Sequence, residues 1–148
     1  MTDGIQFSVT IDTSGYKKVE KDLPQAIEKA LYQMGVLAVE GAVRSISGQY
    51  TVDNKAVDTG RLRASISFIT EKDKGDSGIP QPPNAEADDK LSGNGEKDFV
   101  IVGTNVNYAQ IVHNGTSKRT GRPFLREGID KKKEEMQEKV KDILKQGD

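Results

Sequence analysis

The apolar and polar residues of this chain first alternate and then recur in a helical pattern. Ile5, Phe7, Val9 and Ile11 alternate with polar residues, which is typical of a strand with one buried face. We therefore predict a first strand at the start of the chain.

A long helix is predicted to follow, from about Asp22 to about Ile46. Asp22 precedes Gln25 by three positions with Pro24 between them, which is typical of a helix start, and Gly48 is a typical stop. Its apolar stripe consists of Ile27, Leu31, Met34, Leu37, Ala38, Ala42 and Val43. The small residues that allow a sheet or another helix to approach closely are Ala30, Gly35, Ala38, Gly41 and Ala42.

A polar stretch that contains glycine, Val57–Ile66, joins this helix to a second strand. Asp58 or Thr59 is expected to accept a hydrogen bond from the free N–H groups of a short turn that opens at Gly60. Gly60 lets the backbone pass close to a neighbouring element. Beyond Ser65 the residues alternate again, which predicts the second strand.

Residues 72–97 are rich in Gly, Pro, Asp, Asn and Ser, and we expect no packed structure there. The run Phe99–Val102 is predicted to pair antiparallel with the second strand, which makes residues 72–97 a long hairpin loop. A loop of this length is typical of a binding segment, of a segment that becomes ordered on assembly, or of disorder.

The last part of the chain predicts two further helices. Residues 108–113 are compatible with a short helix or a strand, and we favour the helix, which ends at Gly115. Pro123 and Phe124 open the last helix, which we expect to project from the domain beyond about Lys133, where its other faces are charged, and to fray over residues 145–148. Its apolar stripe consists of Leu125, Ile129, Met136, Val140 and Ile143 or Leu144.

Together these elements predict a single domain over residues 1–148 that contains helices and antiparallel strands. The 148 residues suffice to bury a core without disulfides or a metal. The mean hydropathy of -0.64 indicates more polar surface than an average domain has.

The composition excludes several kinds of catalytic and metal-binding site. The chain has no cysteine and one histidine, His113, so it has no disulfide, thiolate or paired-histidine metal site. It also has no glycine-rich phosphate-binding motif. We expect no enzymatic activity, cofactor, metal or small-molecule substrate, and a soluble, unprocessed protein without a membrane span.

The polar residues that could take part in catalysis or metal binding have simpler structural interpretations. His113 is interpreted as a satisfied or surface histidine. Residues 58–61 hold a carboxylate, a hydroxyl and a guanidinium close together, but a capped turn with a surface arginine explains the same residues. Asp88 and Asp89 lack the spacing of a calcium loop and are interpreted as solvated charge.

The net charge is -1, but the charges are unevenly distributed. Residues 71–98 contain eight acids and four lysines, whereas the ionised side chains of residues 113–126 are all positive. This basic segment includes Lys118, Arg119 and Arg122, without interleaved aromatic residues that would stack on bases. We favour a salt-bridging interface loop over a nucleic-acid site, so we do not expect specific nucleic-acid binding.

Three groups of residues follow one another in a characteristic order. They are Val57–Ile66, then Val102–Thr104 with Tyr108-Ala109 and Gly115-Thr116, then Arg122–Leu125. In this order and spacing the chain resembles the tailed-bacteriophage family of small head–tail connector proteins, also known as tail-completion, neck or minor tail proteins. The resemblance extends from the first strand to the last helix.

This resemblance implies an α+β subunit, in which a long helix in the N-terminal half packs on a small antiparallel β-sheet, with a long hairpin loop and a C-terminal amphipathic helix. It also implies a structural role in the virion and no catalytic residues. Such proteins form rings, often sixfold, at the head–tail junction. The implied partners are other copies of the chain, a portal-adaptor or head-completion protein, and a tail-tube or tail-terminator protein. The implied location is the virion, with assembly in the bacterial host cytoplasm.

A ring needs a head-to-tail interface, in which each subunit presents two different complementary surfaces. We expect the acidic 72–97 loop to pack on the basic segment of a neighbour. The candidate interface residues are Arg61, Arg63, Lys118, Arg119, Arg122, Asp88 and Asp89, and the candidate structural turn residues are Asp58, Thr59, Gly60, Gly115, Pro123 and Phe124. Two other functions stay open: a nucleic-acid-binding accessory protein that uses residues 118–126, and a hydrolase that depends on Asp58 or His113.

Overall fold

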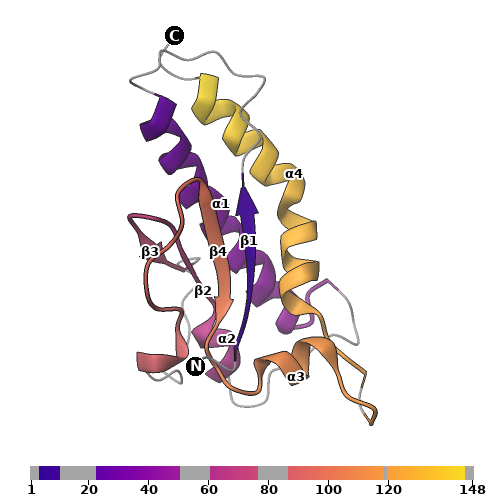
Figure 1. Ribbon diagram of the computed structural model, residues 1–148. Coiled ribbons are helices and arrows are strands. Elements are labelled where there is room, and N and C mark those ends of the chain that lie inside the picture. Colours follow the sequence, from indigo (N-terminus) through magenta and orange to yellow (C-terminus); the bar gives the residue numbers. More distant parts are fainter. Residues whose placement is uncertain (1–3, 11–22, 51–60, 77–86, 119, 146–148) are drawn as a thin grey trace.

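The computed structural model describes residues 4–10, 23–50, 61–76, 87–118 and 120–145 (Figure 1). In chain order its elements are β1 (Ile5–Thr10), α1 (Leu23–Ile46), α2 (Arg61–Ser65), β2 (Ser67–Ile69), β3 (Lys74–Gly75), the 3-10 helix η2 (Ala87–Asp89), β4 (Phe99–Thr104), α3 (Ala109–Asn114) and α4 (Phe124–Lys145). A long helix, a four-stranded antiparallel sheet and a C-terminal helix confirm the predicted α+β class.

The sheet has the strand order β1-β4-β2-β3, and every pair of neighbours is antiparallel. Val102 of β4 lies opposite Phe7 of β1 on one side and Phe68 of β2 on the other, so these side chains form one apolar row. The predicted pairing of Phe99–Val102 with the second strand is therefore confirmed. The second strand begins at Ser67, because residues 61–65 form α2.

Helix α1 covers one face of the sheet, and its small residues allow the close approach that the sequence predicts (Figure 1). A Cβ at Gly35 would lie 2.4 Å from the Phe68 ring, so glycine leaves the space that this ring fills. Helix α1 ends at Ile46, and Gly48 follows with a φ of 81°, the left-handed conformation that favours glycine.

Helix α4 runs antiparallel to α1 along almost its whole length. At the closest point, a Cβ at Gly41 would lie 2.2 Å from the carbonyl oxygen of Gly128. The expectation that α4 projects beyond Lys133 is wrong, because its apolar stripe continues to pack there. Its buried residues in this part are Met136, Val140, Ile143 and Leu144.

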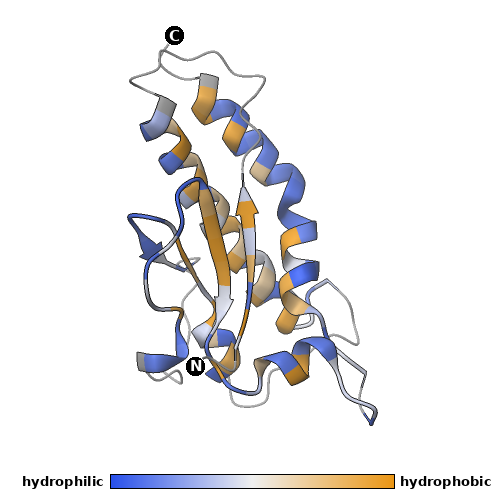
Figure 2. Cartoon of the chain, viewed as in Figure 1, coloured by the Kyte–Doolittle hydropathy of each residue, from blue (hydrophilic) through white to orange (hydrophobic). Residues whose placement is uncertain are grey.

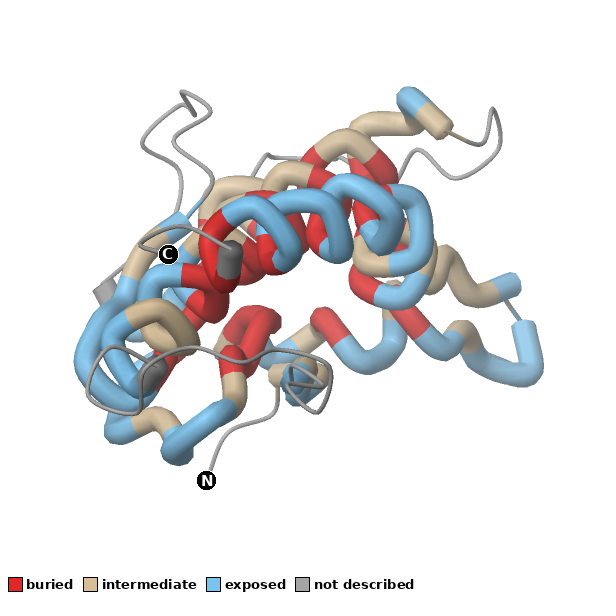
Figure 3. The backbone as a smooth tube through the Cα atoms, turned by 90° about the horizontal axis from the view of Figure 1, so that it is seen from above, coloured by how far each residue is buried: buried red, intermediate tan, exposed pale blue. Residues whose placement is uncertain are grey.

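Polar residues cover the outer side of this helix pair. Figure 2 shows hydrophilic residues over most of α4 and apolar residues along β4. Seen from above, buried residues gather between the helices and the sheet, and exposed residues lie outside (Figure 3). None of the helices in the described ranges is long and apolar enough to cross a membrane.

The second face of the sheet is covered by part of the segment that was expected to lack packed structure. Leu91 packs with Ile69 of β2 and Ile101 of β4 in a small separate cluster. Residues 74–75 form β3 and residues 87–89 form η2. The expectation is therefore wrong at these positions, since Ile69 and Ile101 need an apolar cover on this face.

Candidate assembly surfaces

Ser65 and Thr104, which belong to the stretches 57–66 and 102–104, meet where α2 and β4 end. The hydroxyls of Ser65 and Thr104 lie 2.5 Å apart, and Ser65 also donates to the carbonyl of Leu62 at 2.6 Å. The N–H of Val106 donates to Thr104 Oγ1 at 3.0 Å. These contacts fix α2 to the end of the central strand.

Arg61 forms a bidentate ion pair with Asp89. Its Nε and Nη2 donate to the two carboxylate oxygens of Asp89, each at 2.8 Å. The Asp89 side chain is 6% exposed and that of Arg61 is 37% exposed. The interpretation of Asp89 as solvated charge is wrong, because Arg61 neutralises the carboxylate within the same chain. Asp88 is exposed, as expected.

Backbone hydrogen bonds secure the segment around Asp89. The N–H of Asn105 donates to the carbonyl of Asp89 at 2.8 Å, and its side-chain amide donates to the carbonyl of Lys90 at 2.9 Å. The N–H of Leu91 donates to Ser67 Oγ at 3.0 Å. Residues 89–91 are therefore tied to both β2 and the end of β4.

Arg63, the other arginine of α2, has a different environment. Its Nη1 lies 3.5 Å from the hydroxyl of Ser47, a long hydrogen bond, and its Nε is buried without a hydrogen-bond partner among the described residues. The preceding turn residues, Asp58, Thr59 and Gly60, lie outside the described residues. Their structural role, like the expectation that Arg61 and Arg63 face a neighbour, stays a prediction.

His113 is a buried, hydrogen-bonded histidine, as interpreted from the sequence. Its ring lies between Phe7 and Phe124, with centroid distances of 5.5 and 5.3 Å. Nε2 accepts the backbone N–H of Arg126 at 3.4 Å, and Nδ1 lies 3.1 Å from the side-chain oxygen of Asn114. The geometry therefore favours a proton on Nδ1.

Burial disfavours the protonated form of this histidine. Desolvation lowers the pKa of His113 below its ordinary value of 6.5, the hydrogen bond to Asn114 opposes this, and the charge of Arg126 adds to the lowering. Both ring nitrogens have partners within the chain, so this histidine is a packing residue that joins β1, α3 and α4.

Residues 115–118 and 120–122 belong to a projecting segment that we call the basic hairpin (Figure 1). Gly115, with a φ of 79°, forms an antiparallel bridge with Thr120. The N–H of Arg122 donates to the carbonyl of Val112 at 2.8 Å, which closes the base of the hairpin. Lys118 is exposed on it and Arg122 is half-buried at its base, whereas Arg119 lies outside the described residues.

The base of the basic hairpin is held by the buried start of α4. Phe124 has no exposed surface and packs against His113, and Pro123 precedes it directly. A Cβ at Gly121 would lie 2.7 Å from the carbonyl oxygen of His113, so the returning strand passes close to α3. Phe124 therefore packs in the core and Gly115 has the left-handed conformation that favours glycine, whereas the turn role of Pro123 stays a prediction.

The described residues of 71–76 and 87–98 make up what we call the acidic surface. They include seven acids and four lysines, a net charge of -3, and all of these side chains except Asp89 are exposed. Two of the lysines form ion pairs at 3.2 Å, Lys72 with Glu28 and Lys90 with Asp76. The segment expected from the sequence to be acidic is therefore an exposed surface on one side of the sheet.

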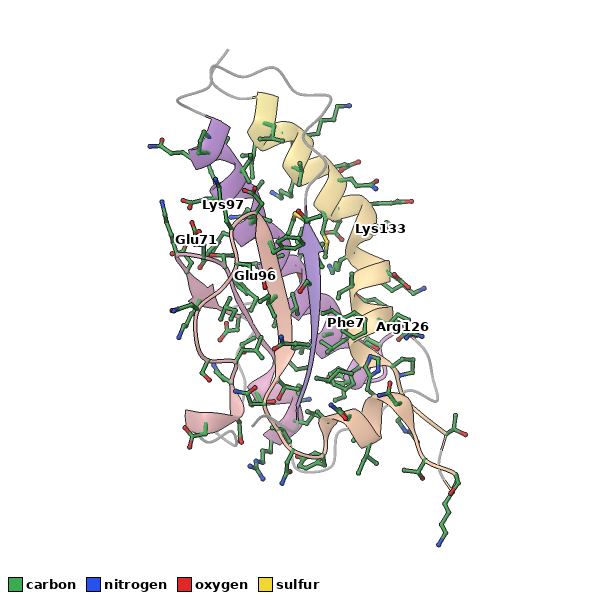
Figure 4. The ribbon with its side chains drawn as sticks, in the orientation of Figure 1. Phe7, Glu71, Glu96, Lys97, Arg126 and Lys133 are labelled. Atoms are coloured by element: carbon green, nitrogen blue, oxygen red, sulfur yellow. The ribbon has the colours of Figure 1, made fainter. Side chains whose placement is uncertain are left out.

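The acidic surface and the basic hairpin lie on opposite sides of the molecule. Figure 4 shows Glu71 and Glu96 on the side that carries β3, and Arg126 on the other side, near the start of α4. The basic hairpin projects from that second side, beyond α3 (Figure 1). Two surfaces of opposite charge are thus displayed in different directions.

The described residues display charged surfaces on two sides of the molecule. Within these ranges, no group of three or more His, Asp and Glu side chains is arranged to hold a metal ion. The sequence did not predict the Arg61–Asp89 pair, since the two residues are far apart along the chain. The isolated apolar Leu91 inside a polar segment was the one signal that this loop packs.

The fold and its surfaces define an α+β protein with two oppositely charged surfaces. Comparison with protein-family models, with curated proteins and with solved structures finds no match to this chain. Its function has therefore to be inferred from its own residues and geometry.

Proposed function

We propose that this protein is a ring-forming structural subunit of the neck of a tailed bacteriophage, where it joins or completes the tail at the head–tail interface. The observation that carries the proposal is the placement of the acidic surface and the basic hairpin on opposite sides of one subunit. Surfaces that differ from each other and complement each other are what a head-to-tail ring requires. The resemblance to head–tail connector proteins supports the same role.

Contacts within the chain hold both surfaces on the same folded domain, which favours a role in a rigid assembly over flexible attachment to a partner. The Arg61–Asp89 pair and the hydrogen bonds of Asn105 hold the acidic surface on the sheet. The contact of His113 with Phe124 holds the base of the basic hairpin. Surfaces that are already ordered lose less conformational entropy when subunits associate.

In this role the subunit acts without catalysis and binds proteins. One surface of each copy meets the other surface of the next copy. The two open sides of the ring then contact the portal-adaptor or head-completion protein and the tail-tube or tail-terminator protein. The proposed location is the head–tail junction of the virion, after assembly in the bacterial cytoplasm.

Sedimentation of the full chain, with and without purified phage tails, tests this proposal. We expect oligomers or tail-bound rings, and we expect association to weaken as salt screens the opposite charges. Reversal of the basic hairpin by Lys118→Glu with Arg119→Glu should leave monomers, as should reversal of the acidic surface by Glu71→Lys with Asp73→Lys. An equimolar mixture of the two variants should associate again, because each supplies the charge that the other has lost.

The matched control reverses two exposed residues of α4, Lys139→Glu and Glu138→Lys, which preserves the net charge and should leave association unchanged. A natural chain that stays monomeric with and without tails would contradict the ring function. Association that the two surface reversals leave unchanged would contradict the role of the charged surfaces.

The exposed basic hairpin also favours a second candidate, a nucleic-acid-binding accessory protein. That function predicts DNA binding whose affinity falls steeply as salt rises, since each phosphate contact releases a counterion. The connector function predicts little or no DNA binding by the isolated subunit. Fluorescence anisotropy with a labelled duplex, measured over a range of salt, separates the two functions.

A further inference from the structure

Two large apolar side chains are exposed in the described part of the chain, Tyr32 at 37% and Ile111 at 56%. A single exposed apolar residue is common on soluble proteins and needs no explanation. The positions of these two are informative, because one lies beside the acidic surface and the other beside the basic hairpin.

Ile111 is held next to the basic hairpin by the backbone. On the same helix, Ala109 and His113 are buried, whereas Ile111 is directed away from the core. The N–H of Gly115, where the hairpin begins, donates to the carbonyl of Ile111 at 2.8 Å. The basic hairpin therefore begins directly after the short helix that exposes Ile111.

Tyr32 is fixed in the same way beside the acidic surface. Its ring packs edge-on against Phe68 at a centroid distance of 5.2 Å, and a Cβ at Gly75 would lie 3.7 Å from its hydroxyl oxygen. One turn earlier in α1, Glu28 pairs with Lys72 at 3.2 Å and binds residues 71–76 to this part of the helix. Tyr32 therefore presents an oriented aromatic ring at the edge of β3.

An apolar anchor surrounded by charged residues is the arrangement from which protein interfaces gain most of their affinity. Tyrosine is enriched among such anchors because a large contact area is fixed at little entropic cost. Each surface here has one anchor and one predominant sign of charge. Like charges would oppose pairing of either surface with itself, so each surface fits the other surface of a second copy.

We propose that Ile111 of one copy packs against Tyr32 of the next copy, with the basic hairpin lying over the acidic surface. This contact rests on the proposed ring function and identifies the subunit interface of that ring. The partner is a second copy of this chain, and the contact is head-to-tail.

Cross-linking tests the contact directly, because the natural chain contains no cysteine. Full-length Ile111→Cys and Tyr32→Cys proteins are mixed in equal amounts and treated with a short bismaleimide. Random encounters give mixed dimers and like dimers in statistical proportion, whereas the proposed contact gives about a 10-fold excess of mixed dimers over either like dimer. Lys74→Cys, on β3 beside Gly75, replaces Tyr32→Cys if loss of the ring prevents folding.

The control replaces Ile111→Cys by Gln137→Cys, which is exposed on α4 and should give statistical cross-linking. Statistical cross-linking, or an excess of like dimers, in the Ile111→Cys mixture would overturn the proposed contact. In parallel, Ile111→Ser should weaken self-association of the cysteine-free chain about 30-fold in Kd, without loss of helical circular dichroism.

The two proposals fail in distinguishable ways. If the natural chain forms rings that Ile111→Ser leaves unchanged and the cross-links are statistical, the Ile111–Tyr32 contact is wrong and the ring function stands. If the natural chain stays monomeric with and without tails, both proposals are wrong.

Discussion

Replacement of either partner of the Arg61–Asp89 pair should destabilise the attachment of residues 87–91 to the sheet. Removal of one partner from a fully buried ion pair costs about 3–5 kcal/mol, because the remaining charge is left without compensation. Asp89 is close to that limit with a side chain 6% exposed, so we expect Arg61→Ala to cost about 3 kcal/mol of unfolding free energy. Arg61 is 37% exposed and can be rehydrated, so we expect Asp89→Ala to cost only about 2 kcal/mol.

The double variant isolates the interaction between the two residues. With both side chains removed no charge is left uncompensated, so the double variant should cost about 3 kcal/mol and give a coupling energy of about 2 kcal/mol. The matched control is the nearby exposed pair of Lys90 and Asp76, whose side chains are 47% and 45% exposed. Its coupling energy should be no more than about 0.5 kcal/mol.

Urea unfolding of the natural chain and the variants measures these free energies. Amide hydrogen exchange localises the effect, because the N–H of Asn105 donates to the carbonyl of Asp89 and should lose protection in Asp89→Ala. A coupling energy no larger than that of the Lys90–Asp76 pair would refute the reasoning. So would unchanged protection of Asn105.

Two further predictions concern the core. Gly128→Ala should lower the free energy of unfolding, measured in urea, by about 2 kcal/mol, because a Cβ there would lie 2.3 Å from the backbone nitrogen of Ala42. The resulting strain outweighs a gain in helix propensity of about 1 kcal/mol. Gln137→Ala on the exposed face of α4 is the control, and a Gly128→Ala variant more stable than the natural chain would contradict this close packing of the two helices. Burial lowers the pKa of His113 below 6.5, so the unfolded chain binds a proton more readily than the folded chain and stability should fall as pH drops below 6.5. Urea unfolding between about pH 7 and about pH 5 should show a shallower loss for His113→Gln than for the natural chain, and equal slopes would exclude this role of His113.

Local patterns were sufficient to predict the main elements of this fold. Alternation in β1 and the three- and four-residue spacing in α1 report directly which residues face the core, since both depend only on near neighbours. The small residues of α1 also predicted close approach, and Gly35 and Gly41 do face Phe68 and Gly128.

The wrong predictions all concern residues whose environment is created by distant parts of the chain. The charged faces of α4 suggested projection, yet Lys132 is buried, with its Nζ 3.5 Å from the carboxylate of Glu40 on α1, far earlier in the chain. Asp89 looked solvated because its partner lies 28 positions earlier. No local period encodes such pairs, so sequence patterns could not have revealed them.

The difference between residues that bind within their own chain and residues that are exposed also decides which variants can test the function. Arg61 belongs to the stretch that resembles connector proteins, but it binds Asp89 in its own chain, so Arg61→Ala would weaken the acidic surface even if no neighbour touched the arginine. Loss of assembly in that variant would therefore not separate folding from recognition. Ile111 and Lys118 are exposed, and replacing them should leave the core intact. An assembly defect that appears in their variants while the unfolding free energy is unchanged is the result that would assign a surface to the proposed ring.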